Sequence, residues 1–391
     1  MHFFIVAITF LWVGLVGAET TDGRLQYSVR NLDDARLWSA LTIYGEDGRL
    51  EAIQTPPQLQ DLAHASAVAL HVTTLPFPLP STGAVELPGV PARMRYGMCE
   101  AEPFADQRAP GICSGFLVGP DLLATAGHCL SATHECGNEV WAFGFHADEL
   151  GNSPASLPAG KLFTCRKVIR YDSVTDFALV QLDRPVQGVQ PLVARQAGSL
   201  TVGTAVGIVG HPLGMPSKMD LGGKVVGGDD THFIATLDSF VNNSGSAVFN
   251  LATLEVEGIL VAGAQDFVYD AEAQCERLAR CAVGECAGEQ VTRVSQILEL
   301  HGGPRALEAA GTGDIDTVRG YLQAGGWVDI SDAGMNTMLH HAYLESHMDI
   351  VHLLIIAGAD ASRRNLMGKR PHESHEGKAP FNFRGITNIE I

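Results

Sequence analysis

The sequence has few basic side chains for its length. Of 391 residues, 26 are Lys or Arg and 44 are Asp or Glu, which gives a formal net charge of −18. Such a chain repels a phosphate backbone, which argues against nucleic acid as a partner. Charged residues are scarce overall at 18%, whereas 46% of the residues are apolar. This composition excludes a disordered chain and predicts a globular protein of two or three folded units.

Long apolar runs are also missing, apart from one at the amino end. Residues 3–16 are apolar, and the run closes on Val16-Gly17-Ala18, small residues of the kind that a signal peptidase reads. At roughly 14 residues the run is shorter than the ~20 that a membrane helix needs. We predict a cleaved signal peptide over residues 1–18 and a secreted or periplasmic protein without a stable membrane anchor. An uncleaved anchor is the alternative, because the amino end carries little positive charge.

Cysteine pairs with the C-x-x-C spacing of zinc sites are absent, and His134 near Cys136 lacks a matching second half. An even number of cysteines in an exported chain favours disulfide bonds. The sequence therefore predicts disulfides, no metal ion and no cofactor. The eight cysteines all lie between residues 99 and 286: Cys99, Cys113, Cys129, Cys136, Cys165, Cys275, Cys281 and Cys286.

From Gly111 to about Gly263, short apolar runs alternate with Gly, Pro, Asp and Asn. Such regularly punctuated runs predict an all-β sandwich or barrel. Near residue 291 the apolar residues take helical spacing, so a helix is expected to close the β region. The predicted strands are residues 116–118, 122–126, 140–145, 177–182, 205–209, 233–237, 247–249 and 258–261; the helical positions are Val291, Val294, Ile297 and Leu298.

Beyond Gly302 the sequence contains a repeat. Val318 and Val351 occupy equivalent positions 33 residues apart, which is the ankyrin period. Residues 337–342, Thr-Met-Leu-His-His-Ala, fit the ankyrin start T-P-L-H-x-A with Met338 in place of Pro. The resemblance to ankyrin repeats covers roughly residues 304–372. It implies a small all-α segment and, as its usual role, recognition of a protein partner.

Two repeats fall below the ~3 normally needed for independent stability, so we expect this segment to dock on the β region or on the helix expected near residue 291. A purely structural cap is the alternative to a binding module. Its histidines, at positions 340, 341, 347, 352, 372 and 375, are assigned no metal, and His340 is expected to be a turn residue.

Three segments carry the parts of a nucleophilic hydrolase. Residues 125–129, Thr-Ala-Gly-His-Cys, place His128 at the end of a strand. Asp176 stands immediately before the apolar strand at 177–182, and Ser244 stands in a Gly-containing turn before another strand. Hydrolysis by a serine needs a base, a carboxylate that holds the base, and backbone donors for the oxyanion. Any one segment alone fits a structural role, but the three together in the order His, Asp, Ser predict a triad.

These segments resemble the motifs of trypsin-like serine peptidases, in the branch shared by glutamyl endopeptidases and bacterial trypsin-like enzymes. The resemblance spans roughly residues 42–300, since Ile43–Arg49 is similar to the opening segment of that branch. It implies a mainly β, chymotrypsin-like double β-barrel. In that family the His of T-A-G-H-C is the general base, the Asp of D-x-A-L orients it and the Ser of G-N-S-G-S-P is the nucleophile, which implies these roles for His128, Asp176 and Ser244. The resemblance also implies the disulfide Cys113–Cys129.

The chain departs from the family pattern around the nucleophile. In the family, a Gly at the position of Asn242 forms the oxyanion hole with its amide, together with the amide of Ser244. Asn tolerates a positive φ better than most residues, so we expect the oxyanion hole to form. We expect catalysis to be slower than with Gly. Ala247 replaces the usual Pro. Asn243 replaces the Asp that pairs with a cleaved amino terminus in trypsin, so activation by an inserted amine is not expected.

Specificity follows less directly from the residues. Asp238 stands six positions before Ser244, where trypsin places the carboxylate that selects Lys and Arg; a structural turn Asp is the equal alternative. Glutamyl specificity relies on a pocket His, and Leu260 occupies that strand here, which argues against selection of Glu. The pocket walls are expected near Ala262 and Gly263.

The sequence thus predicts a secreted serine endopeptidase that acts on a protein or peptide substrate. One alternative is a catalytically impaired binding protein that acts through its ankyrin repeats, and another is an esterase that uses the same triad. The predicted organisation is a signal peptide at 1–18, an arm or propeptide at 19–41, the peptidase domain at 42–301, ankyrin repeats at 302–375 and a tail at 376–391.

Overall fold

The computed structural model describes residues 19–21, 24–26, 43–130, 136–198, 200–281 and 287–374. The chain divides into two units, Met1–Ser39 and Ala40–Ile391. In the first unit, β1 (Glu19–Thr21) and β2 (Arg24–Gln26) pair as an antiparallel hairpin. The predicted signal peptide and the predicted tail lie outside the described residues.

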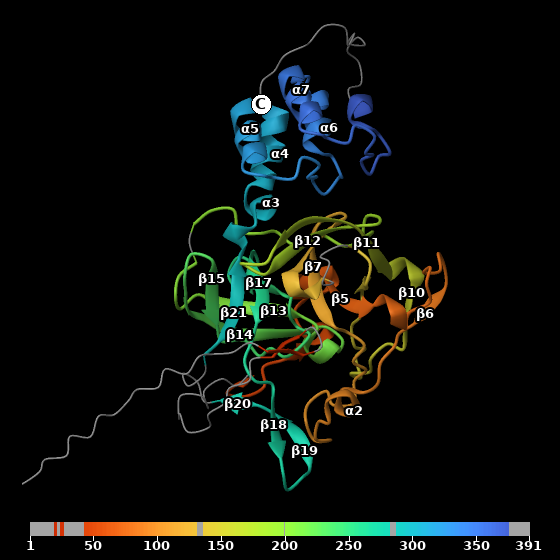
Figure 1. Ribbon diagram of the computed structural model, residues 1–391, viewed down its shortest axis with the longest axis vertical. Helices are drawn as coiled ribbons and strands as arrows, with labels where there is room; N and C mark the ends of the chain where they lie inside the picture. Colours follow the sequence, from red (N-terminus) through yellow and green to blue (C-terminus); the bar gives the residue numbers. More distant parts are fainter. Residues whose placement is uncertain are drawn as a thin grey trace, which may run out of the picture. The chain divides into compact units, whose positions relative to one another are not determined.

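Six antiparallel strands of the second unit close into a first barrel, in the order β11-β12-β8-β7-β5-β9 (Figure 1). Its interior is filled by large apolar side chains, among them Phe116, Trp141 and Phe143, each with no exposed surface. The strands are β5 (Ser66–His71), β7 (Cys113–Gly119), β8 (Leu122–Ala126), β9 (Glu139–Phe143), β11 (Leu162–Asp172) and β12 (Phe177–Leu182).

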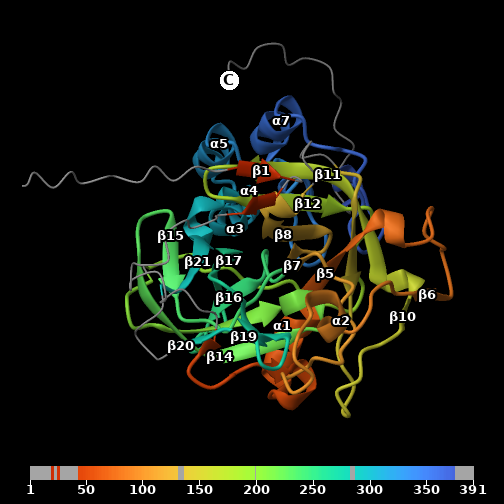
Figure 2. The same cartoon turned by 60° about the horizontal axis from the view of Figure 1, so that its bottom comes forward.

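A second group of six strands runs in the order β13-β16-β17-β21-β15-β14 and closes where β13 pairs with β14. Figure 2 shows the strands β14, β15, β16, β17 and β21 of this group. Strand β4 (Leu50–Glu51) extends the sheet beside β14. The strands are β13 (Ala205–Gly210), β14 (Lys218–Gly228), β15 (His232–Ala235), β16 (Ala247–Asn250), β17 (Val256–Ala262) and β21 (Glu289–Arg293).

The predicted mainly β fold with two barrels is confirmed, and each predicted strand falls within or overlaps an observed one. The expected helix at Val291 is wrong, because Val291 lies in β21, where it pairs with Phe233 and Leu260. Closing the barrel requires a strand here; Val294 lies in a 3-10 turn, Val294–Gln296, and the next α-helix, α3 (Leu298–His301), begins seven residues after Val291. The sequence pattern did not predict strands β11 and β14, because polar residues and glycines interrupt the apolar residues of both strands.

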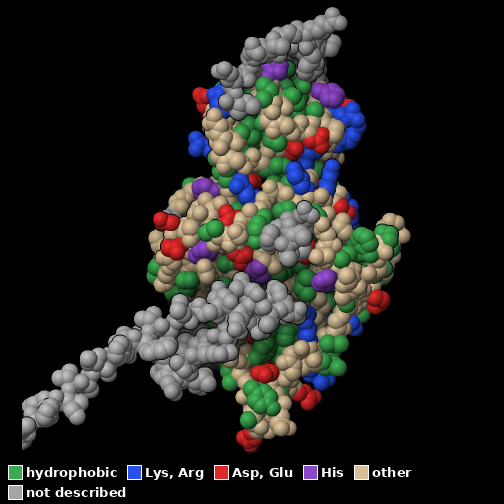
Figure 3. Space-filling view, viewed as in Figure 1, with side chains coloured by type: hydrophobic (Ala, Val, Ile, Leu, Met, Phe, Trp, Pro, Cys, Tyr) green, Lys and Arg blue, Asp and Glu red, His purple; other side chains and the backbone are tan. Residues whose placement is uncertain are grey.

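Shorter elements surround the barrels. Strand β3 (Ile43–Tyr44) pairs in parallel with β20 (Arg280–Cys281), and β18 (Phe267–Asp270) forms a hairpin with β19 (Cys275–Leu278). Val268 and Tyr269 of this hairpin are exposed, and Figure 3 shows hydrophobic side chains at the position of the hairpin, at the bottom of the view. The remaining elements are α1 (Pro57–Ala65), β6 (Ala84–Glu86), α2 (Ala92–Tyr96) and β10 (Ser156–Pro158).

Disulfide bonds join distant parts of the second unit. The structure pairs Cys113 with Cys129, and it also contains Cys99–Cys275 and Cys136–Cys165, which the sequence did not specify. Cys281 is disulfide-bonded as well. The bond from Cys99 reaches strand β19 and ties the exposed hairpin to the segment after α2.

After α3 the described chain is helical, as predicted, with α4 (Gly303–Thr312), α5 (Ile315–Gln323), α6 (Met338–Leu344) and α7 (Met348–Ile356) packed around a core of their own. Asp314 caps α5 by accepting from the Thr317 amide, and Thr337 forms a capping box with His340 at the start of α6. His340 therefore lies in a helix, not in the expected turn. In the described residues, no helix is both long enough and apolar enough for a membrane span.

The helices are bonded to the first barrel. Arg170 of β11 donates from Nε and from a terminal nitrogen to Glu299 Oε1 of α3, at 3.0 and 2.9 Å, and also to the Gly325 carbonyl. Arg363 donates to both oxygens of Asp121, at 2.8 and 2.9 Å. The side chain of Glu299 is 1% exposed, so its charge depends on Arg170 for compensation.

Replacing Arg170 by Ala should destabilise the protein by about 3 kcal/mol, because it leaves the Glu299 carboxylate buried without its partner. The matched control is Arg319→Ala, which breaks the exposed pair of Arg319 with Asp316 and should cost less than about 0.5 kcal/mol. Urea unfolding followed by circular dichroism measures both. Equal effects of the two variants would show that the Arg170–Glu299 pair does not hold the helices to the barrel.

Candidate active site

The predicted base and carboxylate are in direct contact. His128 lies in a single 3-10 turn, Gly127–Cys129, that follows β8, and its Nδ1 is 2.7 Å from Asp176 Oδ2. The other carboxylate oxygen, Oδ1, accepts from the His128 amide at 2.8 Å. One carboxylate therefore binds both the ring and the backbone of the histidine. This arrangement fixes the tautomer with a proton on Nδ1 and leaves Nε2 as the basic nitrogen.

The turn that carries Asp176 is held from several sides. Asp172 Oδ1 accepts from the amides of Val174 and Thr175, and the Thr292 hydroxyl of β21 donates to the Thr175 carbonyl. Asp176 itself has a φ of 53°, a left-handed conformation that Asp tolerates better than most residues. The amide of Gly127 donates to the Asp176 carbonyl at 2.9 Å.

Glycine is required at position 127 because of this close approach. A Cβ on Gly127 would lie 2.9 Å from Asp176 Oδ1 and 3.1 Å from Tyr171 Cε2. A larger side chain would therefore push the carboxylate away from His128. The motif residue before the histidine thus has a steric function that the sequence pattern alone does not reveal.

Ser244 stands in a tight turn before β16. Its carbonyl accepts from the Ser114 amide of β7 at 2.8 Å, while Gly245 has a φ of 90° and donates to the Leu260 carbonyl at 2.7 Å. A Cβ on Gly245 would lie 2.0 Å from the Ser114 carbonyl oxygen, so only glycine fits there. The side chain of Asn243 braces the turn from behind by bonding to Ser239 and Ser246.

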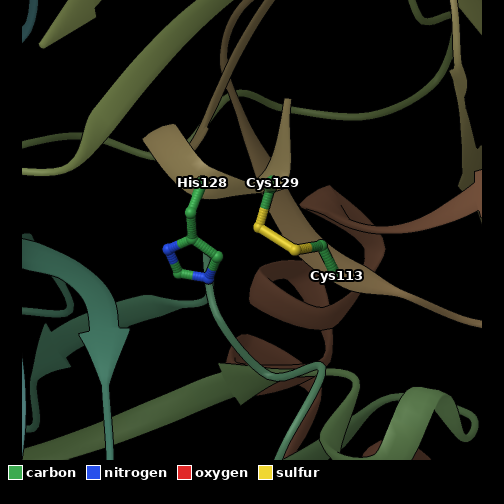
Figure 4. Close-up of side chains that lie close together, drawn as sticks. All are labelled: Cys113, His128 and Cys129. Atoms are coloured by element: carbon green, nitrogen blue, oxygen red, sulfur yellow. A yellow bond between two sulfur atoms is a disulfide. The ribbon is translucent and has the colours of Figure 1, made fainter. Parts of the chain in front are cut away.

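Strand β7 connects the two halves of the site. Cys113, one residue before Ser114, is bonded to Cys129, the residue after His128 (Figure 4). Cys129 Sγ also lies 3.5 Å from the Ser244 carbonyl oxygen. The serine and the histidine are thus anchored to neighbouring residues of the same strand.

Cys113, His128 and Cys129 have ligand atoms within 4.8 Å of one another, and within the described ranges no other group of three His, Cys, Asp or Glu residues comes as close. Metal binding by cysteine requires the thiolate, and both sulfur atoms are consumed in the disulfide. This group therefore does not form a metal site.

Two backbone amides near Ser244 are available for a negatively charged oxygen. Within the part of the chain that the structure describes, neither the Asn242 amide nor the Ser244 amide donates a hydrogen bond. Asn242 has a φ of 69°, the conformation for which glycine is the usual residue. Its side chain donates to the Tyr96 hydroxyl at 2.7 Å and to the Gly111 carbonyl at 3.2 Å, and its carbonyl accepts from Ser114 Oγ at 3.2 Å. Tyr96 and Ser114 thus support the turn, and no motif had indicated them.

Asp238, a candidate for the specificity pocket, is occupied by backbone amides. Its two oxygens accept from Tyr44, at 2.9 Å, and from Gly48, at 2.6 Å, so the residue anchors the segment after β3. Burial, followed by the nearby Asp220 charge, raises the pKa of Asp238 to about 6. These contacts favour the structural alternative for Asp238.

A second group of carboxyls, which the sequence analysis missed, lies behind the candidate pocket walls. Ala262 and Gly263 are exposed, and a Cβ on Gly263 would lie 2.2 Å from Oε2 of the buried Glu289. Burial, reinforced by Asp266, raises the pKa of Glu289 well above its ordinary value. Burial likewise raises the pKa of Asp266 to about 7, and Asp266 accepts from the Val241 amide just before Asn242.

Comparison with known proteins adds a family assignment for part of the chain. Residues 113–259, which include His128, Asp176 and Ser244, match the model of the trypsin-like peptidase domain. Among curated proteins, no match was found.

Three solved structures illustrate the likeness. A Glu endopeptidase in complex with MPD is 19% identical, with 62% of this chain and 95% of that chain covered and a TM-score of 0.37. The inactive form of the Rv3671c protease, from M. tuberculosis, is 14% identical, with 66% and 96% covered and a TM-score of 0.37. A structure of GrC is 18% identical, with 48% and 84% covered and a TM-score of 0.34.

The raised pKa of Asp266 predicts a pH-dependent stability. The folded state holds this proton more tightly than the unfolded state, whose carboxyl has an ordinary pKa of 3.8, so the contribution is complete below pH ~4 and is lost as the pH rises through about 7. Asp266→Asn keeps an acceptor for the Val241 amide but has no proton to lose. Its free energy of unfolding, relative to that of the native chain, should therefore rise by about 2 kcal/mol when the pH is raised from 5.5 to 8.

Urea unfolding at the two pH values measures this gain, and the difference between variant and native chain removes the contribution of other titrating groups. Glu149→Gln, at an exposed carboxylate, is the control and should show no such change. A gain for Asp266→Asn that is the same at both pH values would contradict the prediction.

Proposed function

We propose that this chain is a serine endopeptidase in which Ser244 is the nucleophile, His128 the general base and Asp176 the residue that orients the base. The observation that carries the proposal is the 2.7 Å contact of His128 Nδ1 with Asp176, beside a serine turn that β7 ties to the same histidine. The match of residues 113–259 to the trypsin-like peptidase domain supports the same conclusion.

The reaction follows from these contacts. His128 Nε2 removes the proton from the Ser244 hydroxyl as its oxygen attacks the carbonyl carbon of the peptide bond. Asp176 stabilises the imidazolium that forms, and the amides of Asn242 and Ser244 donate to the developing oxyanion. His128 then transfers the proton to the leaving amine, which leaves an acyl-enzyme that water hydrolyses through the same steps. The proposal requires no cofactor.

We further propose that the helices form a pair of ankyrin repeats. Their caps support this proposal, since Asp314 and His347 precede α5 and α7 at positions 33 residues apart, and Gly325 and Gly358 follow these helices, each with a φ of 89°. The disulfides favour an oxidising compartment, which fits export by the predicted signal peptide.

An activity-based probe tests the nucleophile. A fluorophosphonate should label the purified native chain, and Ser244→Ala should abolish labelling because the probe reacts with an activated serine. Ser81→Ala, at an exposed serine outside the candidate site, is the control and should label normally. A native chain that folds, as judged by circular dichroism, and yet remains unlabelled would contradict the proposal and favour the binding-protein alternative.

The positive φ of Asn242 predicts different labelling rates for two substitutions at this position. Asn242→Gly keeps the positive φ and should label within about threefold of the native rate. Asn242→Ala loses the bonds to Tyr96 and Gly111, and a left-handed Ala costs about 1–2 kcal/mol, so the amide should leave the oxyanion position and the rate should fall about 10- to 100-fold. The rate constant of fluorophosphonate labelling measures both, and similar rates would show that the φ of this residue does not control the oxyanion hole.

A further inference from the structure

A cavity of about 670 Å³ lies where the helices meet the first barrel. The barrel contributes the connection between β7 and β8 together with residues 190–194, and the helical segment contributes faces of α4 and α6. This volume is in the range of ligand-binding cavities, ~300–1,000 Å³. It is separate from the group formed by His128, Asp176 and Ser244, since none of these residues lines it.

The walls of the cavity are mainly apolar. Leu192 and Ile330 are buried, whereas Val193 keeps 64% of its surface exposed. Leu307 and Trp327 complete the apolar lining. An exposed Val beside buried Leu and Ile side chains leaves apolar surface that another apolar group would cover favourably.

The polar lining of the cavity is acidic. It contains four carboxylates and, among the described residues that line it, no Lys or Arg. Asp332 is paired with His341 at 3.0 Å, but the exposed side chains of Glu308 and Glu345 bond to no other described residue. Glu308 belongs to α4 and Glu345 directly follows α6, so two separate elements supply the unpaired charges.

The fourth carboxylate, Glu299, adds an independent indication. Its side chain is 1% exposed, and one oxygen accepts both bonds from Arg170. The other oxygen, Oε2, is buried and has no hydrogen-bond partner within the described ranges. A buried acceptor without a donor costs free energy, so this part of the cavity favours a group that brings a donor.

The basic residues of this junction line a different cavity. That second cavity, of about 540 Å³, also contains Trp327, and in Figure 3 Lys and Arg side chains gather where the helices meet the barrel. Asp121, Asp183, Asp329 and Asp360 also line this second cavity, so it carries both signs of charge, whereas no Lys or Arg among the described residues lines the 670 Å³ cavity. The basic residues lining the second cavity are Arg166, Lys167, Arg184, Arg363 and Arg364.

We propose that the 670 Å³ cavity is a docking site for a basic polypeptide segment that carries a large apolar side chain. The apolar side chain covers Val193 and packs against Leu307 and Ile330, and flanking Lys or Arg side chains meet Glu308 and Glu345. A polypeptide fits better than a small cation because it places positive charges on both sides of one apolar group, as the two separate glutamates require. The proposal does not depend on peptidase activity.

The test uses the full chain with Ser244→Ala, so that no probe is cleaved whatever the activity. The probe is a fluorescein-labelled dodecapeptide of alternating Lys and Leu, titrated by fluorescence anisotropy in 0.15 M NaCl. It should bind at least about tenfold more tightly than an alternating Glu and Leu peptide or an alternating Lys and Ser peptide, because binding requires both charge and apolar contact. Failure of the Lys and Leu peptide to bind, or equal binding of the Lys and Ser peptide, would overturn the proposal.

A charge-matched pair of variants locates the site. Glu308→Lys with Glu345→Lys should weaken binding about tenfold, since two contacts become repulsive. Glu149→Lys with Glu272→Lys changes the net charge equally at exposed positions that do not line the cavity and should leave affinity unchanged. Equal weakening by both double variants would show attraction to the overall negative charge and would overturn the assignment of the cavity.

Discussion

The bond between the Ser114 amide of β7 and the Ser244 carbonyl holds the candidate site together. It joins a strand of the first barrel to the serine turn of the second, and the neighbouring disulfide from Cys113 to Cys129 joins the same strand to the histidine. A hydrogen bond and a covalent bond one residue apart leave little freedom between the backbone of Ser244 and that of His128, the proposed nucleophile and base. Preorganisation of this kind lowers the cost of reaching a reactive geometry, which is why two barrels can supply one site.

Asn242 shows how the fold accommodates an unusual residue beside the nucleophile. A left-handed backbone is unfavourable for residues with a Cβ, and here Tyr96, Gly111 and Ser114 bond to the side chain and carbonyl of the asparagine. The surroundings thus replace, with hydrogen bonds, the conformational freedom that glycine would provide. The Asn242 amide is thereby held in one orientation, which the proposed oxyanion hole requires.

The helical segment is a structural part of the second unit. Glu299 is buried in α3 and takes its compensating charge from Arg170, a residue of the strand that leads into the Asp176 turn. From the other side, Thr292 of β21 bonds to Thr175, directly before Asp176. The strand that bonds to the helices through Arg170 thus also leads into the turn of Asp176, and β21, which precedes the helices in the chain, bonds to the same turn.

The sequence by itself determined the mainly β fold, the helical segment and the three residues proposed for the triad, because each depends on local information: short apolar runs, a 33-residue period and compact motifs around His128, Asp176 and Ser244. The strands β11, β14 and β21 were not predicted, since polar residues and glycines interrupt the apolar pattern of β11 and β14, and the apolar residues of β21 continue into a helical spacing. The grouping of the carboxyls of Asp238, Asp266 and Glu289 was not predicted either. Only the tertiary structure decided that they are buried near one another, because burial and electrostatic interaction depend on distances in space, which spacing along the chain does not encode.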